Sequence, residues 1–203
     1  GGGSTAPEPD GNAQAVIFVT HGEIHLNIAG TSFSLGAGGY AYIPAGADWT
    51  IRATDGGYAA PAIFHWIRKH YVAVEGVSHP EPFVISDHET DPIQMPDCDG
   101  IWATTRFVDP ADLRHDMHVN IVTLHPGGVI PFAETHVMEH GLFILQGTGD
   151  YLLNTSWVEV AAGDFLWLRA FCPQACTATG SEPFRYLLYK DVNRHMPLSP
   201  GGL

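Results

Sequence analysis

Short apolar stretches, separated by glycine, proline and aspartate, recur along most of the chain. Apolar and polar residues alternate at 24–28, as expected of a strand with one buried face, and another strand is expected at 184–191. The stretch 15–19 is apolar throughout, which is typical of a more deeply buried strand. This pattern predicts an all-β protein built from many short strands. Further strands are expected at 62–67, 100–108, 119–124, 151–153 and 157–160.

The two halves of the chain carry matching features. Gly22 matches Gly147, and Trp49 matches Gln174. Residues 64–69 of the first half also resemble residues 185–190 of the second half, with Lys69 matched to Lys190. A repeat of roughly 120 residues is far longer than the repeat of a solenoid, so it predicts two β domains and not a stacked array.

Three segments follow from this repeat. We expect an N-terminal domain at residues 1–72 and a C-terminal domain at residues 115–203. Residues 73–114 are rich in proline, aspartate and histidine and have weak periodicity, which indicates a linker that packs across both domains. Within this linker, residues 109–112 predict a turn.

Composition narrows the class of partner. The 203 residues include 23 glycines and 15 prolines, which favour short strands and turns over long helices. A net charge of −13 argues against nucleic acid or an anionic membrane as a partner. Three scattered cysteines, no signal-peptide pattern and no apolar run of membrane-spanning length predict a soluble cytoplasmic protein without disulfides. A small molecule is the expected ligand.

The densest group of ionisable side chains lies in the segment 128–147. If this segment is extended, the even spacing of Glu134, His136 and His140 places all three side chains on one face. A single histidine is usually a hydrogen-bonded core or surface residue. Here apolar neighbours raise the cost of leaving three such groups unpaired, and a divalent cation removes that cost. The segment therefore favours a metal site over a polar core cluster.

The spacing of this segment resembles the first cupin motif, with Gly128 and Gly147 in the glycine positions. Glu134, His136 and His140 then occupy the three ligand positions. Glutamate replaces the usual first histidine, and histidine replaces the usual final glutamate, so the set keeps one carboxylate.

The stretch 163–174 resembles the second cupin motif, with Arg169 and Phe171 in place of the usual proline and glycine. Gln174 falls in the fourth ligand position. A glutamine alone would be interpreted as a surface residue, and the matched spacing is what makes it a candidate ligand. Cys172 and Cys176 flank it, but no second cysteine or histidine pair accompanies them, so we expect small buried residues and not a zinc site.

A ligand set of Glu, two His and Gln is similar to that of the (S)-ureidoglycine aminohydrolases, bicupin enzymes of purine and allantoin breakdown that use manganese. The sequence of residues 115–195 closely resembles that of the family, and residues 16–114 resemble it more loosely. The resemblance implies two jelly-roll cupin barrels and a homo-oligomer. It also implies a Mn²⁺ ion held by Glu134, His136, His140 and Gln174.

The resemblance further implies how a substrate is held. Alternation places Tyr186 and Lys190 on one face of the strand expected at 184–191, and the family pattern turns that face to the metal pocket. Glu134, Gln174, Tyr186 and Lys190 would bind (S)-ureidoglycine, which loses ammonia to give (S)-ureidoglycolate. Lys190 would supply a cation near the carboxylate, and Glu134 is the ionised ligand able to carry a proton.

The N-terminal domain carries a degenerate copy of the same motifs. Its ligand positions hold Glu8, Asp10, Ala15 and Trp49. An alanine and an indole cannot bind a metal ion, so this domain is expected to be a cupin barrel without metal. The strands that should precede its first motif are absent from the sequence, so the N-terminal barrel is expected to be incomplete.

Two other functions fit the same residues. A cupin enzyme of another type, a dioxygenase or an isomerase acting on a small acid, would differ in consuming oxygen or needing iron. A non-catalytic bicupin would bind a metabolite without turnover. His88, His115 and His118 lie outside the motif spacing and are expected to be structural.

Overall fold

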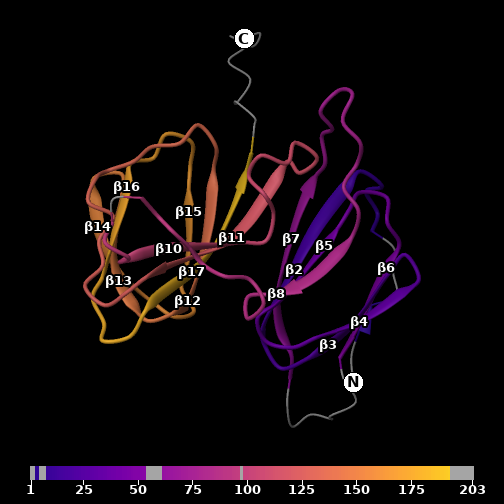
Figure 1. Cartoon of the computed structure of the whole chain (residues 1–203), viewed down its shortest axis with the longest axis horizontal. Helices are drawn as coiled ribbons and strands as arrows, with labels where there is room; N and C mark the ends of the chain where they lie inside the picture. The colour runs from indigo at the N-terminus through magenta and orange to yellow at the C-terminus, as the bar shows by residue number, and fades with distance from the viewer. Residues whose placement is uncertain (1–2, 5–7, 54–60, 97, 193–203) are drawn as a thin grey trace. The chain divides into compact units, whose positions relative to one another are not determined.

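The computed structural model describes residues 3–4, 8–53, 61–96 and 98–192 (Figure 1). All the regular elements in these residues are β-strands, which confirms the all-β fold expected from the alternating pattern. Nowhere in the described part of the chain is there an apolar helix of membrane-spanning length.

The chain divides into two compact units. The N-terminal unit contains residues 1–91 and 112–115, and the C-terminal unit contains residues 92–111 and 116–203. The boundaries differ from those expected at 72 and 115, because strands in the segment expected as a linker pair with strands of the units themselves. One such strand, β8, pairs with β5 of the N-terminal unit, whereas β9 and β10 extend a sheet of the C-terminal unit.

Two four-stranded antiparallel sheets form the N-terminal unit, in the orders β1-β6-β3-β4 and β7-β2-β5-β8. A core of buried aliphatic side chains from both sheets, including Ile17 and Leu26, holds them together. The strands are β1 (Gly3–Ser4), β2 (Ala13–His21), β3 (Ile24–Ile28), β4 (Thr31–Leu35), β5 (Gly39–Ile43), β6 (Trp49–Ala53), β7 (Ile63–His70) and β8 (Phe83–Ser86).

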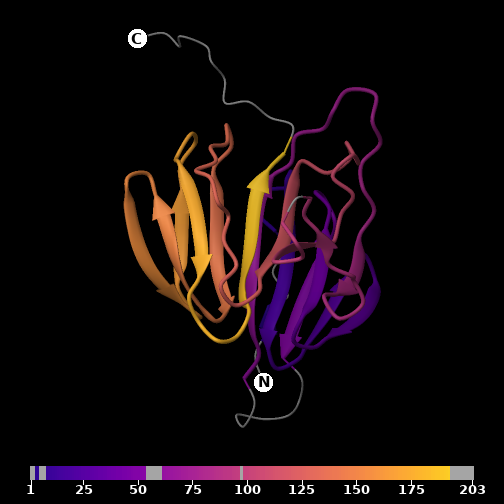
Figure 2. The same cartoon turned by 60° about the vertical axis from the view of Figure 1, so that its left-hand side comes forward.

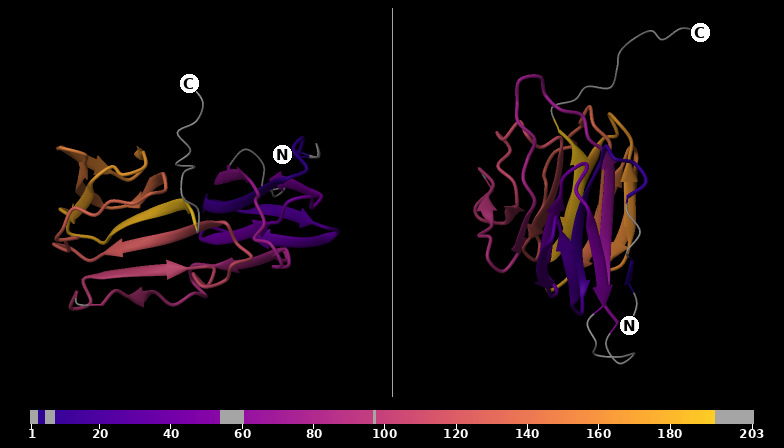
Figure 3. Two further views of the ribbon diagram at one scale, coloured as in Figure 1. Left: turned by 90° about the horizontal axis from the view of Figure 1, so that it is seen from above. Right: turned by 90° about the vertical axis from the view of Figure 1, so that its right-hand side faces the viewer.

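A six-stranded sheet, β15-β12-β17-β11-β10-β9, and a three-stranded sheet, β14-β13-β16, form the C-terminal unit. Figures 2 and 3 show these strands from other directions. The strands are β9 (Ile93–Gln94), β10 (Trp102–Arg106), β11 (Met117–Leu124), β12 (His140–Gln146), β13 (Thr148–Leu153), β14 (Ser156–Ala161), β15 (Phe165–Leu168), β16 (Gln174–Ala178) and β17 (Phe184–Asp191).

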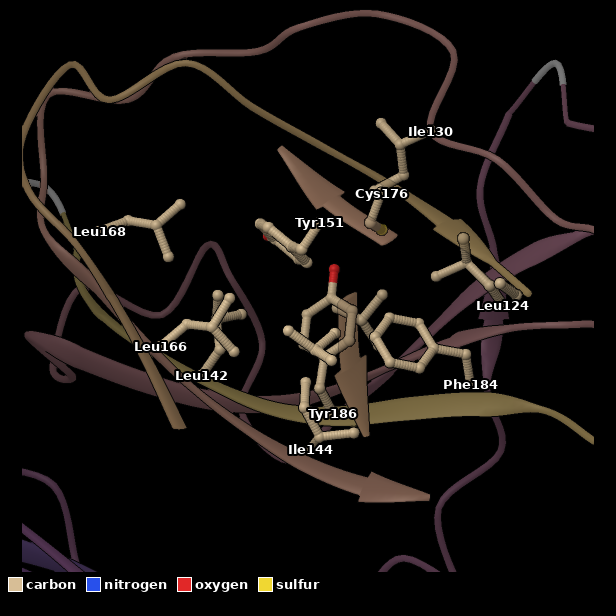
Figure 4. Close-up of a cluster of buried hydrophobic side chains, with 13 residues drawn as sticks. Leu124, Ile130, Leu142, Ile144, Tyr151, Leu166, Leu168, Cys176, Phe184 and Tyr186 are labelled. Carbon is tan, nitrogen blue, oxygen red and sulfur yellow. The ribbon is translucent and has the colours of Figure 1, made fainter. Parts of the chain in front are cut away.

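The core of the C-terminal unit combines aliphatic and aromatic side chains from both of its sheets. Leu142 and Ile144 on β12 pack with Tyr151 on β13 and with Phe184 and Tyr186 on β17. Figure 4 shows the Tyr186 hydroxyl pointing into this cluster. The core therefore contains polar atoms that need partners, and these lie beside the candidate site.

The strand order of the N-terminal unit is repeated in the C-terminal unit. The order β7-β2-β5 recurs as β17-β12-β15, and β6-β3-β4 recurs as β16-β13-β14. Strands β2 and β12 each carry a register shift just before the matched glycines Gly22 and Gly147. The repeat found in the sequence is therefore also present in the hydrogen-bonding pattern.

Strand pairing corrects one detail of the repeat. Ala15 pairs with Arg68 across β2 and β7, and His140 pairs with Lys190 across β12 and β17. Since Ala15 and His140 stand in matching places, Arg68 is the counterpart of Lys190. The sequence comparison of 64–69 with 185–190, which matched Lys69 to Lys190, was wrong by one residue. Such a slip exchanges the two faces of a strand.

Candidate active site

Side chains of the C-terminal unit line a cavity of about 250 Å³. One wall consists of residues at alternating positions on four neighbouring strands, because every second residue of a strand points to the same face. Tyr186, Leu188 and Lys190 all line the cavity, as alternation along 184–191 predicts. The other residues of this wall are Trp102, Thr104 and Arg106 on β10, His118, Asn120 and Val122 on β11, and His140 and Leu142 on β12.

The four expected metal ligands all line this cavity, but they reach it by a different route from the one expected. His140 is the first residue of β12, whereas the segment 131–139 contains no strand. The expectation of one extended segment was therefore wrong. Instead, Glu134 and Gln174 form an isolated bridge and exchange two backbone hydrogen bonds of 2.9 Å. The backbone N–H of Phe171 donates to the His136 carbonyl at 2.7 Å.

Contacts between the donor side chains join them in a row. His136 Nε2 lies 3.3 Å from Glu134 Oε2, and the rings of His136 and His140 are 4.7 Å apart. Gln174 Nε2 lies 3.3 Å from His140 Nδ1. Within the described residues, no three acidic, imidazole or thiol side chains meet closely enough to form a metal-ligand group. The four-ligand set therefore stays a prediction.

The row of donors runs from solvent to interior. Glu134 and His136 keep 26% and 30% of their side chains exposed, whereas His140 and Gln174 are buried. The Tyr151 hydroxyl donates to Gln174 Oε1 at 2.9 Å. An amide oxygen has two lone pairs, so this hydrogen bond leaves one of them for another partner. The exposed end gives a small molecule access to the buried end.

His140 is the residue whose surroundings best fit a bound cation. Burial lowers its pKa to about 4, with further contributions from His136 and Lys190 and an opposing one from Glu134. The ring is therefore neutral at pH 7, the form that binds metals. Among the described residues, its buried Nε2 has no hydrogen-bond partner. Such orphaned buried atoms are uncommon in proteins.

The donor set itself suits a divalent cation. Imidazole nitrogens with carboxylate and amide oxygens are ligands for Mn²⁺, Fe²⁺ or Zn²⁺. The neighbouring Cys176 is not among the residues that line the cavity, and burial raises the pKa of its thiol to about 12. Cys98, Cys172 and Cys176 are all free.

Lys190 and Arg106 bring positive charge to the same cavity. Burial lowers the pKa of Lys190, and Arg106 lowers it further, while Glu134 opposes both effects. Burial also raises the pKa of Tyr186, so its hydroxyl keeps its proton near neutral pH. A half-buried lysine side chain beside a protonated phenol suits an anionic ligand with hydrogen-bond acceptors.

Three ionisable residues of the cavity were missed by sequence reasoning. His118 was expected to be structural, yet it is buried, lines the cavity and pairs in register with Lys190. Arg106 and Tyr151 were not singled out at all. Alternation along β10 and β11 could have indicated Arg106 and His118, but both strands lie outside the two motifs.

The matching positions of the N-terminal unit hold an ion pair. Arg68 donates to both carboxylate oxygens of Glu8, including 2.8 Å from Nε to Oε2. His70 Nδ1 lies 3.4 Å from Asp10 Oδ2. The hydrogen bond from Arg68 is the main reason that the pKa of Glu8 is lowered. The carboxylate at this position already has its cation.

Comparison with known proteins assigns the chain to a family. The cupin domain family matches residues 120–189. The (S)-ureidoglycine aminohydrolase of Escherichia coli (strain K12) is 32% identical over 188 residues, which cover 91% of this chain and 69% of that protein. The chain belongs to the (S)-ureidoglycine aminohydrolase family. The Arabidopsis thaliana (S)-ureidoglycine aminohydrolase is 30% identical over 193 residues, 95% of this chain and 62% of that protein.

Relatives in the ureidoglycine aminohydrolase family are longer than this chain. A rice protein (Oryza sativa subsp. japonica) assigned to the same activity is 34% identical over 95% of this chain, but the match spans only 60% of the rice protein. The family is therefore shown over most of this chain, and the activity of the whole relatives is carried over below as a proposal.

Solved structures of similar proteins have the same fold as this member of the ureidoglycine aminohydrolase family. A Pseudomonas aeruginosa protein provisionally named glyoxylate-induced protein is 60% identical with a TM-score of 0.90, covering 97% of this chain and 72% of that one. Protein YlbA from E. coli is 29% identical with a TM-score of 0.79, covering 96% and 74%. Bacillus subtilis oxalate decarboxylase, at 14% identity and a TM-score of 0.66 over 91% and 65%, shares the fold alone.

Proposed function

We propose that the chain is a manganese-dependent hydrolase that releases ammonia from (S)-ureidoglycine and gives (S)-ureidoglycolate. The observation that carries this proposal is the buried, neutral His140, whose Nε2 has no partner among the described residues and which shares a cavity with Glu134, Gln174 and Lys190. The names of the family relatives support the choice of substrate.

Glu134, His136, His140 and Gln174 would hold the Mn²⁺ ion. When bound, the ion supplies Lewis-acid polarisation to a substrate that offers it an amine and a carboxylate. For His140 Nε2 to act as a ligand, the ring proton must lie on Nδ1. Gln174, which faces Nδ1, must then accept a hydrogen bond from it. The amide of Gln174 meets that requirement when it is turned over, so that its oxygen accepts from Nδ1 and its nitrogen donates to the Tyr151 hydroxyl oxygen. The second lone pair of the amide oxygen is then left for the ion.

The remaining residues bind the substrate and move a proton. Lys190 binds the substrate carboxylate, and the protonated Tyr186 donates a hydrogen bond to it. The reaction breaks the bond between carbon and the amino nitrogen, and water adds oxygen to that carbon. Glu134 takes a proton from the water and gives it to the departing amine, so that ammonia leaves and the carboxylate is regenerated.

Ammonia release from freshly prepared (S)-ureidoglycine tests the proposal. We expect release by the Mn²⁺-loaded protein, an (S)-configured product, and loss of activity after chelation. No ammonia above the spontaneous rate would reject the proposal, and oxygen uptake in its place would indicate an oxidising cupin.

The two lysines of the chain provide a matched pair of variants. Lys190→Met should raise KM for ureidoglycine at least about 10-fold, because a buried charge-assisted hydrogen bond is lost, while manganese content stays unchanged. Lys69→Met in the N-terminal unit removes the same charge and should change neither. An unchanged KM in Lys190→Met would remove Lys190 from the substrate site.

A further inference from the structure

Arg106 lines the cavity from a strand that neither cupin motif includes. It lies on β10 and pairs in register with Asn120 on β11, which in turn pairs with Leu188 on β17. The neighbouring row across the strands contains His118, Lys190 and His140. Arg106 is therefore one row and two strands away from Lys190, on the same cavity wall.

The guanidinium of Arg106 is half-buried, and within the described part of the chain no hydrogen bond or ion pair to it is found. Arginine stays charged at all physiological pH values, and a partly buried charge without a partner is costly. Glu134 is the one carboxylate among the cavity-lining residues, and it contacts His136. Arg106 is thus a candidate for contact with a ligand.

We propose that Arg106 is a specificity-determining residue that donates hydrogen bonds to the ureido carbonyl oxygen of the substrate. This inference rests on the proposed function. Lys190 supplies a point charge for the carboxylate, so the N–H donors of the Arg106 guanidinium are left for the other acceptor of the substrate, the ureido carbonyl oxygen. Adjacent strands are about 4.8 Å apart, so the backbones of β10 and β17 are separated by about 10 Å. A molecule with acceptors at both ends can span the two side chains.

The assignment explains why the cavity carries two cations for a substrate with a single carboxylate. Ureidoglycine has its carboxylate at one end and its carbamoyl group at the other. Arg106 would therefore select for the carbamoyl end, and a small acid that lacks this end would gain nothing from Arg106. Selectivity of this kind comes from leaving a buried polar group unpaired when the wrong ligand binds.

Calorimetric titration of two stable ligands into the Mn²⁺-loaded protein tests the inference. N-carbamoylglycine keeps the carboxylate and the ureido group, and glycolate keeps only the carboxylate end. Arg106→Gln should weaken N-carbamoylglycine binding by about 10- to 100-fold and change glycolate binding by less than about twofold. Arg106→Lys should recover part of the loss, because it restores the charge without the fork.

Arg185→Gln is the matched control, since Arg185 lies on β17 at an outward-facing position between the inward-facing Phe184 and Tyr186. It should leave both ligands unaffected. Equal weakening of both ligands by Arg106→Gln would overturn the inference, because Arg106 would then act only on the carboxylate. No weakening of either would also overturn it. N-carbamoylglycine binding to the unaltered protein no more tightly than glycolate would overturn it as well, whereas the absence of ammonia release from (S)-ureidoglycine would reject the proposed function.

Discussion

The two units use one strand framework for two different electrostatic arrangements. Where the C-terminal unit pairs His140 with Lys190, the N-terminal unit pairs Ala15 with Arg68. Replacing the imidazole by a methyl group removes a metal donor, and Arg68 neutralises Glu8 directly. In the C-terminal unit, by contrast, Lys190 lines an open cavity and His140 Nε2 has no partner among the described residues.

This difference suggests that a carboxylate at the first ligand position always needs a positive partner. In the N-terminal unit the partner is a guanidinium within the chain, and in the C-terminal unit we propose that it is a metal ion. Scaffold residues and ligand residues can therefore be altered separately, and the variants below test that separation from the largest expected effect to the smallest.

Glu134→Gln should lower the affinity for Mn²⁺ by at least about 100-fold, because removing a ligand costs more than the loss of a supporting hydrogen bond. Manganese content after dialysis, together with titration of the metal-free protein, measures this loss. Glu8→Gln is the matched control and should leave manganese binding unchanged. Equal losses in the two variants would show that the N-terminal unit also binds the metal.

Alanine at the matched glycines should destabilise both units alike. Gly22 and Gly147 have φ values of +72° and +76°, and an added Cβ would lie 2.8 Å from the Pro61 carbonyl oxygen and 2.5 Å from that of Pro183. Each substitution should cost about 2–4 kcal/mol in the free energy of urea unfolding.

Gly30→Ala is the control for these glycines. It has a φ of +84° with no atom within 4 Å of the added Cβ, so only the backbone strain remains, about 1 kcal/mol. A cost at Gly147 no greater than at Gly30 would contradict the close approach.

Acid should weaken the metal-free protein through His140. Its pKa is lowered to about 4, so below its ordinary value of 6.5 the unfolded chain takes up a proton before the folded one does. Stability should therefore fall by on the order of 2 kcal/mol between pH 6.5 and 4. Urea unfolding at several pH values gives the free energy of unfolding as a function of pH. This free energy should fall less steeply towards acid pH in His140→Gln than in the unaltered protein. An identical slope in both proteins would contradict the burial of a neutral ring.

The smallest effect is expected at the ion pair of the N-terminal unit. Arg68→Gln should lower the free energy of unfolding only slightly, because the Arg68 side chain is 40% exposed and water screens the pair. Manganese binding should not change. A loss of several kcal/mol would mean that Glu8 is left buried without a partner.

Local patterns in the sequence were sufficient for the fold class, and motif spacing selected four side chains that line one cavity. The alternation at 24–28 corresponds to β3, whose side chains are buried on one face and more exposed on the other, and the strand expected at 184–191 corresponds to β17. Motif spacing selected Glu134 and Gln174, which the structure joins by two backbone hydrogen bonds. Neither the bridge nor the non-extended path between Glu134 and His140 is visible in the spacing.

Residues that reach the cavity by long-range strand pairing could not be found in the same way. Arg106 and His118 line the site because β10 pairs with β11 and β11 pairs with β17. No local pattern encodes which strands become neighbours. The confusion of Lys69 with Arg68 has a related cause. Two segments of similar residues can be aligned equally well with a shift of one residue, and only the hydrogen bonds between strands fix the register.

The bridge between Glu134 and Gln174 has a mechanical consequence. Two main-chain hydrogen bonds clamp the loop of one donor to the strand of the other, so thermal fluctuation displaces both by the same amount. The distance between the backbones that carry the Glu134 carboxylate and the Gln174 amide is therefore set by these two hydrogen bonds and not by the mobility of either loop. Sequence drift in the surrounding turns can proceed without altering that distance.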